Sequence, residues 1–262
     1  MRRVLIILPA LWAAILSTTT ARAGDTWVDL THTLSAEAVF WPTAAPYART
    51  TVFEGQTEGG YYYSAYSFST AEHGGTHIDA PVHFAEGRRS VDEIPLEQLI
   101  GNAVVIDVGA AVAKDRDYRV GVNDFEAWEA RHGTIPEGSI VLLRTGFDQY
   151  WPDAAKYLGT ALRGEAGAAA LSFPGLSEAG ADWLVTERRV KAVGIDTASI
   201  DYGKSRDFRT HVRLMEDNVP AFENVANLGE LPATGAFVVA LPAKLAGGSG
   251  GPLRIVARIG TP

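Results

Sequence analysis

Hydrophobic and β-branched residues in this chain gather in short runs that are separated by polar and turn-forming segments. Such runs, bounded by Gly, Pro, Asn or Asp, predict β-strands. The predicted strands cover residues 27–34, 61–70, 103–108, 139–144, 190–195, 237–241 and 253–259. Helical patterns are fewer, at residues 95–100, 122–131 and 177–186. Strands interleaved with few helices predict a single α/β domain with a mixed β-sheet or barrel-like core.

Local residue types set the ends of the predicted helices. Asp124 and Ser177 are suited to cap helix starts, because a short polar side chain can accept a hydrogen bond from the first free N–H groups. Gly101 and Gly133 are expected to end the helices that precede them. The segment from Gly247 to Gly251 is predicted to be a turn.

The predicted strand at residues 61–70 is rich in aromatic and hydroxyl side chains, and it leads directly to Glu72 and His73. Successive side chains of a strand point to opposite faces, so Tyr61–Tyr63 cannot all face one side. At least one tyrosine should face solvent or a pocket. The sequence leaves open whether that pocket belongs to the same subunit or to a neighbour.

The N-terminus has the three parts of a secretory signal peptide. Arg2 and Arg3 precede an apolar run from Val4 to Leu16, and Ala21-Arg22-Ala23 is a small-x-small cleavage site. We therefore expect residues 1–23 to be removed and residues 24–262 to form the mature domain, secreted or periplasmic and without a membrane partner. The arginine pair allows either the general or the twin-arginine export route.

Charge and cysteine usage exclude several functions. The formal net charge is −8, and it becomes −11 when three arginines leave with the signal peptide. An acidic protein is a poor ligand for nucleic acid. The chain has no cysteine, so thiol nucleophiles and thiolate metal ligands are excluded. Any metal must be held by His, Asp and Glu.

Three of the six histidines lie between residues 73 and 83, which read His-Gly-Gly-Thr-His-Ile-Asp-Ala-Pro-Val-His. His77 and Asp79 are two residues apart, so on a strand they share a face. The glycines after His73 favour a turn, and Pro81 should end the strand and leave His83 on a loop. Imidazole and carboxylate groups bind zinc, manganese or iron, so this cluster predicts a metal or catalytic site.

The run from His73 to His83 resembles the H-x-G-T-H-x-D-x-P-x-H signature of the cyclase family, which includes bacterial kynurenine formamidases and isatin hydrolases. The resemblance extends over most of the mature chain. Further matching segments are Leu143-Arg144-Thr145-Gly146, Gly194 to Ser199, His211 with Glu223-Asn224-Val225-Ala226-Asn227-Leu228, and Gly251-Pro252-Leu253-Arg254. Membership implies a swivelling β/β/α fold and a homo-oligomer, either a dimer or a tetramer.

The resemblance implies metal ligands that spacing alone leaves open. His73, His77 and Asp79 would bind the metal. Asp79 would bridge two ions, and His211 and Glu223 would complete the second site. The formamidases of the family use two zinc ions, whereas isatin hydrolases use one manganese ion and lack the residue that matches Glu223. Retention of Glu223 favours two Zn²⁺ ions, with Mn²⁺ as the alternative.

The resemblance implies two further roles, and with them a reaction. His83 would be the catalytic proton donor and acceptor, and Trp41 would be an aromatic wall for the substrate. We therefore expect an exported metal-dependent hydrolase that cleaves an amide C–N bond in a small aromatic substrate such as N-formylkynurenine. The alternatives are a hydrolase of a cyclic amide or lactone such as isatin, and a non-catalytic periplasmic metal or small-ligand binder. The export signal is untypical of cytoplasmic tryptophan catabolism, and Thr43-Ala44 replaces the Gly-Asp that commonly follows Trp-Pro in formamidases.

Overall fold

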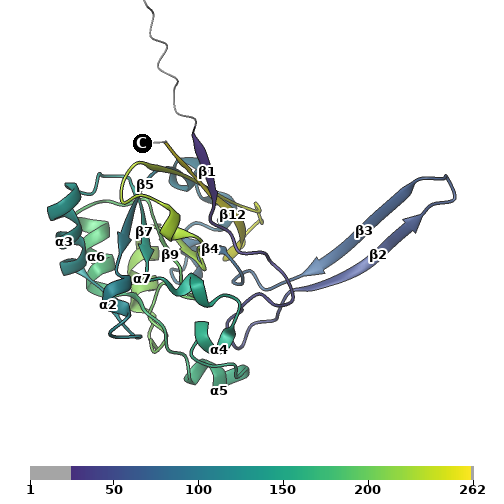
Figure 1. Ribbon diagram of the computed structural model, residues 1–262, viewed down its shortest axis with the longest axis horizontal. Helices are drawn as coiled ribbons and strands as arrows, with labels where there is room; N and C mark the ends of the chain where they lie inside the picture. The colour runs from purple at the N-terminus through teal and green to yellow at the C-terminus, as the bar shows by residue number, and fades with distance from the viewer. Residues whose placement is uncertain (1–24, 261–262) are drawn as a thin grey trace, which may run out of the picture.

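The computed structural model describes residues 25–260, which form a closed β-barrel with helices packed on one side (Figure 1). The barrel strands follow the order β12-β11-β5-β7-β9-β10-β4, β4 returns to β12, and β1 lies outside against β12. Their bounds are β1 Thr26–Asp29, β4 His77–Asp79, β5 Ile100–Asp107, β7 Ile140–Arg144, β9 Ala192–Ile195, β10 Ala221–Glu223, β11 Ala236–Pro242 and β12 Gly250–Ile259. The predicted single α/β domain with a barrel-like core is confirmed.

The barrel closes because β12 is long enough to pair with two strands. Its residues 253–259 pair antiparallel with β11, and its first residues, Gly250–Pro252, pair antiparallel with β4. On the opposite side, β5, β7, β9 and β10 run parallel. The closed circuit brings the short strand β4 between β10 and β12, which positions the histidine cluster.

The parallel strands are buried on both faces, which explains their continuous apolar sequence. Val105 and Leu142 lie in the core inside the barrel, whereas Val104 and Val141 lie in the core between the barrel and the helices. This outer core is covered by α3 (Val122–His132) and α6 (Glu178–Thr186). The alternation of the strand side chains therefore sorts one apolar run into two cores.

The remaining elements are short. The helices are α1 Leu96–Leu99, α2 Gly109–Val112, α4 Ala154–Tyr157, α5 Gly164–Ala169 and α7 Arg209–Glu216. The 3₁₀ helices are η1 Pro81–His83, η2 Val91–Glu93, η3 Phe147–Tyr150 and η4 Leu228–Glu230, and a small parallel pair consists of β6 Arg119–Val120 and β8 Gly175–Leu176. The predicted cap at Ser177 is confirmed, since its hydroxyl accepts a hydrogen bond from Gly180 N at 3.0 Å.

A long hairpin of β2 (Ala48–Gln56) and β3 (Tyr62–Ser69) extends from the body of the protein, and we call it the arm (Figure 1). The prediction of a strand at residues 61–70 is confirmed. Its partner β2 was missed, because residues 48–56 lack an apolar run. Tyr61–Tyr63 lie at the far end of the arm and are exposed, so they do not line a pocket within their own subunit.

Four predicted features differ in the structure. The first strand ends at Asp29, three residues after Thr26. Gly101 does not stop a helix but lies in β5, which begins at Ile100. His83 lies in the 3₁₀ turn η1, which Pro81 begins. Gly250 and Gly251 belong to β12, since the barrel closes through them.

The predicted signal peptide, residues 1–23, lies outside the described residues and stays a prediction. Among residues 25–260, no helix has the length and apolar character needed to cross a membrane.

Candidate metal and active site

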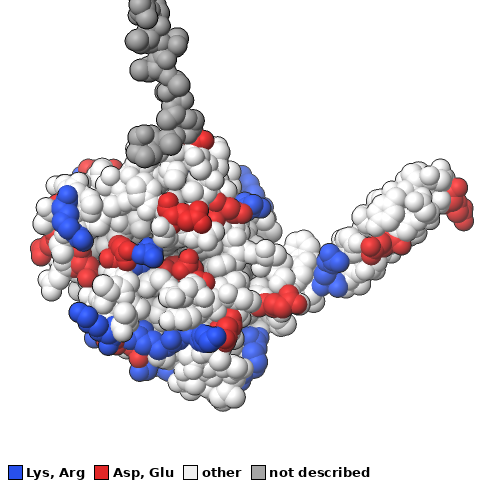
Figure 2. All heavy atoms as spheres, in the orientation of Figure 1, with Lys and Arg blue, Asp and Glu red and all other residues white. Residues whose placement is uncertain are grey.

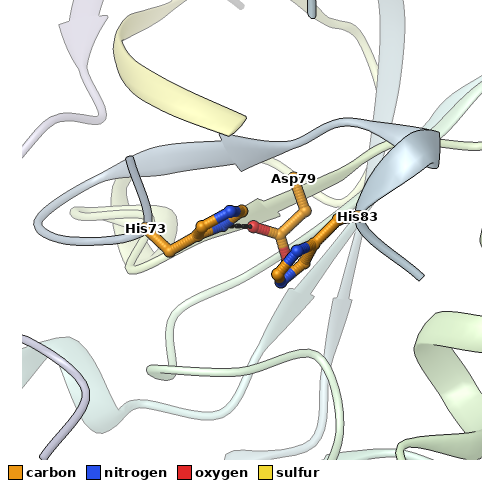
Figure 3. Close-up of side chains that lie close together, drawn as sticks. All are labelled: His73, Asp79 and His83. Carbon is orange, nitrogen blue, oxygen red and sulfur yellow. Dashed lines mark hydrogen bonds and ion pairs between the residues drawn. The ribbon is translucent and has the colours of Figure 1, made fainter. Parts of the chain in front are cut away.

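The first half of the site is built by β4 and the turn before it. His73 Nδ1 lies 2.6 Å from Asp79 Oδ1, and His77 Nε2 lies 3.1 Å from the same oxygen. Figure 3 shows the His73 ring directed at the Asp79 carboxylate, with His83 beside them. The predicted face shared by His77 and Asp79 is present, so the local spacing gives this half of the site its geometry.

The second half of the site comes from α7 and β10, and it meets the first half at Asp79. His211 Nε2 lies 3.1 Å from Asp79 Oδ2 and 3.1 Å from Glu223 Oε1. Glu223 Oε2 lies 3.5 Å from His77 Nε2. The structure therefore brings together all five predicted ligands, with one Asp79 oxygen facing each half.

Strand pairing aligns the two halves. In the antiparallel pair of β4 and β10, Glu223 stands opposite His77 and Ala221 opposite Asp79. Cross-strand neighbours on one face lie within side-chain reach of each other. The close passage of β12 also requires a glycine, because a Cβ on Gly250 would lie 2.5 Å from Cε1 of His73. The closed barrel thus fixes where the ligands lie.

Each histidine of the cluster uses its outer ring nitrogen in a hydrogen bond that directs the inner nitrogen to the carboxylates. His77 Nδ1 lies 2.9 Å from the carbonyl oxygen of Gly75, and His211 Nδ1 lies 2.6 Å from Asp201 Oδ2. Such hydrogen bonds fix the ring orientation and the tautomer in metal-binding histidines. Asp201 also accepts hydrogen bonds from the backbone N–H groups of Thr210 and His211, so it holds the start of α7 as well.

His73 is oriented by a longer chain of hydrogen bonds. Its Nε2 lies 2.9 Å from Ser249 Oγ, and the Ser249 hydroxyl donates to Glu72 Oε2 at 2.7 Å. Since the hydroxyl proton goes to Glu72, the serine oxygen accepts the proton of His73 Nε2. Sequence reasoning missed Asp201, Ser249 and the role of Glu72, because no spacing rule connects residues 249 and 73.

The electrostatics of the cluster show an excess of buried negative charge. Burial lowers the pKa of His77, but the adjacent carboxylates of Asp79 and Glu223 outweigh it and raise the pKa to about 9. The pKa of His211 is likewise raised well above its ordinary value, since its carboxylate partners outweigh burial. Burial and the charge of Asp79 raise the pKa of Glu223. The carboxylates of this cluster therefore stabilise a positive charge next to them, whether a protonated histidine or a bound cation.

The cluster fits a bound metal by two observations. His77 Nε2 is buried and, among residues 25–260, makes no hydrogen bond, although it points at two carboxylates. The donor atoms of His77, Asp79 and Glu223 all lie within 4.8 Å of one another. His83 lies equally close to His73 and Asp79, so the predicted proton carrier borders the ligands. Nitrogen and oxygen donors in this arrangement suit Zn²⁺ or Mn²⁺.

His83 and Trp41 lie on the walls of a pocket above the cluster. The pocket has a volume of about 290 Å³ and is lined largely by apolar and aromatic side chains, Phe84 and Phe208 among them. The His83 ring stacks on His73 with 3.8 Å between centroids, and burial lowers the pKa of His83 to about 4. The Trp41 ring lies 6.3 Å from that of Phe208. The predicted aromatic wall and proton carrier therefore lie where a substrate would sit.

The family comparison agrees with this geometry. The cyclase family, described as "Putative cyclase", matches residues 28–202. The chain belongs to this family, which confirms the resemblance inferred from the histidine signature.

Among its relatives, isatin hydrolase from Roseibium aggregatum is 33% identical over 196 residues, which cover 72% of each chain. Kynurenine formamidase from Salinibacter ruber is 27% identical over 88% of this chain and 96% of its own. The solved structure of isatin hydrolase A from Ralstonia solanacearum has a TM-score of 0.81 and 34% identity, covering 90% of this chain and 92% of that one. The protein is thus a hydrolase of the cyclase family.

Proposed function

We propose that this protein is a metal-dependent hydrolase that cleaves an amide C–N bond in a small aromatic substrate such as N-formylkynurenine. One observation carries the proposal: four buried or half-buried ligands surround the fifth, Asp79, below an aromatic pocket, with His83 at the border between the ligands and the pocket. Similarity to a kynurenine formamidase over most of both chains supports an amide substrate.

His73, His77 and Asp79 would hold one ion, and Asp79, His211 and Glu223 would hold a second. Zinc fits this donor set, with manganese as the alternative. When bound, the metal supplies a water of lowered pKa and a positive charge next to the substrate carbonyl oxygen.

The side chains of the pocket perform the remaining steps. Trp41 and Phe208 would bind the substrate ring, which excludes water from that side of the pocket. His83 would accept a proton from the attacking water at one ring nitrogen and donate it to the leaving nitrogen. Its position on the pocket wall, stacked on His73, supports this role.

A second candidate is hydrolysis of a cyclic amide or lactone, as in an isatin hydrolase. It is favoured by sequence identity, which is 33% to the isatin hydrolase and 27% to the formamidase. Incubation of zinc- and manganese-loaded protein with N-formylkynurenine, isatin and a panel of small lactones distinguishes the two. Turnover of N-formylkynurenine alone supports the first proposal, and turnover of isatin or a lactone supports the second. No turnover of any compound favours a non-catalytic binder.

We also propose that the protein is exported to a periplasmic or secreted location and acts as a homo-oligomer, a dimer or a tetramer. The charged and apolar parts of residues 1–23 support export. The exposed aromatic side chains of the arm support self-association. Mass spectrometry of the exported protein should find Gly24 at its N-terminus, and retention of residues 1–23 would contradict export by cleavage.

A further inference from the structure

The arm exposes aromatic side chains that the rest of residues 25–260 does not cover. Phe68 is 67% exposed and Tyr62 is 58% exposed, and only Gly55 and Ala65 are even partly buried in the two strands. Figure 2 shows the arm as a largely uncharged surface with isolated charged groups. Exposed apolar patches mark interaction sites, and an isolated two-stranded hairpin is only marginally stable in water. The arm therefore requires a partner surface.

Five of these exposed side chains share one face, which we call the arm stripe. It consists of Tyr62, Tyr66 and Phe68 on β3 and Arg49 and Glu54 on β2. Alternation along β3 puts Tyr62, Tyr66 and Phe68 on the same side and Tyr63 on the other. The Arg49 guanidinium lies 4.1 Å from the centre of the Tyr66 ring, and the Tyr62 hydroxyl donates to Glu54 at 3.4 Å. These contacts place the two charged residues on the side of Tyr62 and Tyr66, whereas Phe53 and Tyr63 stack on the other side.

An irregularity in β2 makes this arrangement possible. The strand register shifts between Thr51 and Phe53, so Val52 is an extra residue in β2. A bulge of this kind reverses which side the following residues face. Arg49 and Glu54, five positions apart, therefore point to the same side, whereas in a regular strand they would point to opposite sides.

The arm stripe is complementary to its own reversed copy. Arg49 stands opposite Phe68, toward the base of the arm, and Glu54 stands opposite Ser64, toward the tip. If a second arm lies antiparallel on the first, each Arg49 meets a Glu54, and the two Tyr66 rings, which lie between these two levels, meet each other. One positive and one negative charge give the stripe no net charge, which disfavours nucleic acid or an anionic membrane as the occupant.

We propose that the arm stripe pairs with the arm stripe of a second copy of this chain about a two-fold axis, with Arg49 of each copy facing Glu54 of the other. A two-fold contact uses the same patch on both subunits, which a self-complementary stripe satisfies. The inference rests on the proposed homo-oligomer and is independent of the proposed hydrolysis.

Charge exchange tests this pairing in the full mature chain. The variants Arg49→Glu and Glu54→Arg each place like charges at both contacts, while an equimolar mixture of the two restores opposite charges at both. Analytical ultracentrifugation should show an oligomer for the unsubstituted protein and a dissociation constant raised on the order of a hundredfold in each single variant. The mixture should associate again with close to the original affinity. Glu58→Arg, in the turn at the arm tip, is the matched control and should leave association unchanged.

Each contrary result overturns a different statement. An unsubstituted protein that is monomeric at micromolar concentration contradicts both the oligomer and the arm contact. An oligomer that neither variant weakens contradicts the arm contact and leaves the oligomer standing. Single variants that dissociate but do not recover on mixing contradict the reciprocal pairing of Arg49 with Glu54. Hydrolysis and metal content are measured separately, so their failure does not affect these outcomes.

Discussion

The two halves of the proposed metal site are built in different ways. His73, His77 and Asp79 lie within one strand and its preceding turn, and the His73 side chain is still 24% exposed. His211 and Glu223 come from a helix and a strand far along the chain, and both are buried. The first half depends on local backbone geometry, whereas the second exists only when β10 pairs with both β4 and β9. Metal content is therefore a measure of barrel closure as well as of ligand chemistry.

Replacement of the shared residue should remove both halves. Asp79 presents one oxygen to His73 and His77 and the other to His211, so Asp79→Ala should reduce the bound metal from about two equivalents to none. Hydrolysis should fall to the uncatalysed rate. Elemental analysis after dialysis checks the metal content, with the exposed Glu137→Ala as control. One retained equivalent would show that Asp79 does not connect the halves.

Substitution of His83 should impair catalysis without affecting metal binding. His83→Ala removes the proposed proton carrier but none of the five ligands, so kcat should fall by about 10²–10⁴-fold while the metal content is kept. His132→Ala removes another imidazole, at the end of α3, and should leave kcat unchanged. Full turnover by a metal-loaded His83→Ala protein would disprove the role.

Substitution of Glu223 should remove the half of the site that His211 and Glu223 form and leave the half that His73, His77 and Asp79 form. Glu223→Ala should lower the bound metal from about two equivalents to one, because His73, His77 and Asp79 remain. Elemental analysis is again the measurement, and the exposed Glu230→Ala is the control. If the stoichiometry does not change, Glu223 only supports the structure through its hydrogen bond from Ile200 N at 2.7 Å.

Substitution of Ser249 should weaken metal binding only at the half of the site that His73, His77 and Asp79 form. Ser249→Ala breaks the chain from His73 to Glu72, so metal affinity should fall by about 10–100-fold, as for other residues that orient metal ligands. Titration against a chelator of known affinity measures this. Ser249→Thr keeps the hydroxyl and should restore binding. Equal affinities for the alanine variant and the unsubstituted protein would rule out a positioning role.

Trp41 lies outside both halves and should have the smallest effect. Trp41→Ala should raise KM for an aromatic substrate by about two- to tenfold, since one aromatic contact is lost. Trp41→Phe keeps a ring and should change KM less. Steady-state kinetics with the substrate found in the panel checks this, and an unchanged KM in the alanine variant means that Trp41 is not a substrate wall.

The comparison of the two halves also explains which parts of the fold and site could be predicted from the sequence. Strands buried on both faces have apolar runs, so β5, β7 and β9 were predictable. Buried positions alternate along β11 and β12, and their β-branched and apolar residues made these strands predictable too. The ligands of β4 were predictable because a two-residue spacing on a strand already fixes a shared face. By contrast, β10 has three residues and β2 has no apolar run, so neither has a pattern to detect.

The half of the site that His211 and Glu223 form depends on contacts between residues far apart in the sequence, which local sequence patterns do not reveal. His211 and Glu223 were named from family resemblance. His211, Leu214 and Met215 do have the spacing of a helix face, but that spacing alone does not connect His211 with Glu223. Asp201 and Ser249 act through hydrogen bonds to His211 and His73 that only the closed barrel creates. Residues that orient ligands thus need the structure, even where the ligands themselves do not.

The central claim is that the two halves meet at Asp79 and together hold two metal ions. The most direct test is the number of zinc equivalents retained by the mature, unsubstituted protein after loading and exhaustive dialysis. The proposed ligand sets predict about two equivalents, as in other two-metal hydrolytic sites. One equivalent, or none, would contradict the claim that the α7–β10 half completes the site.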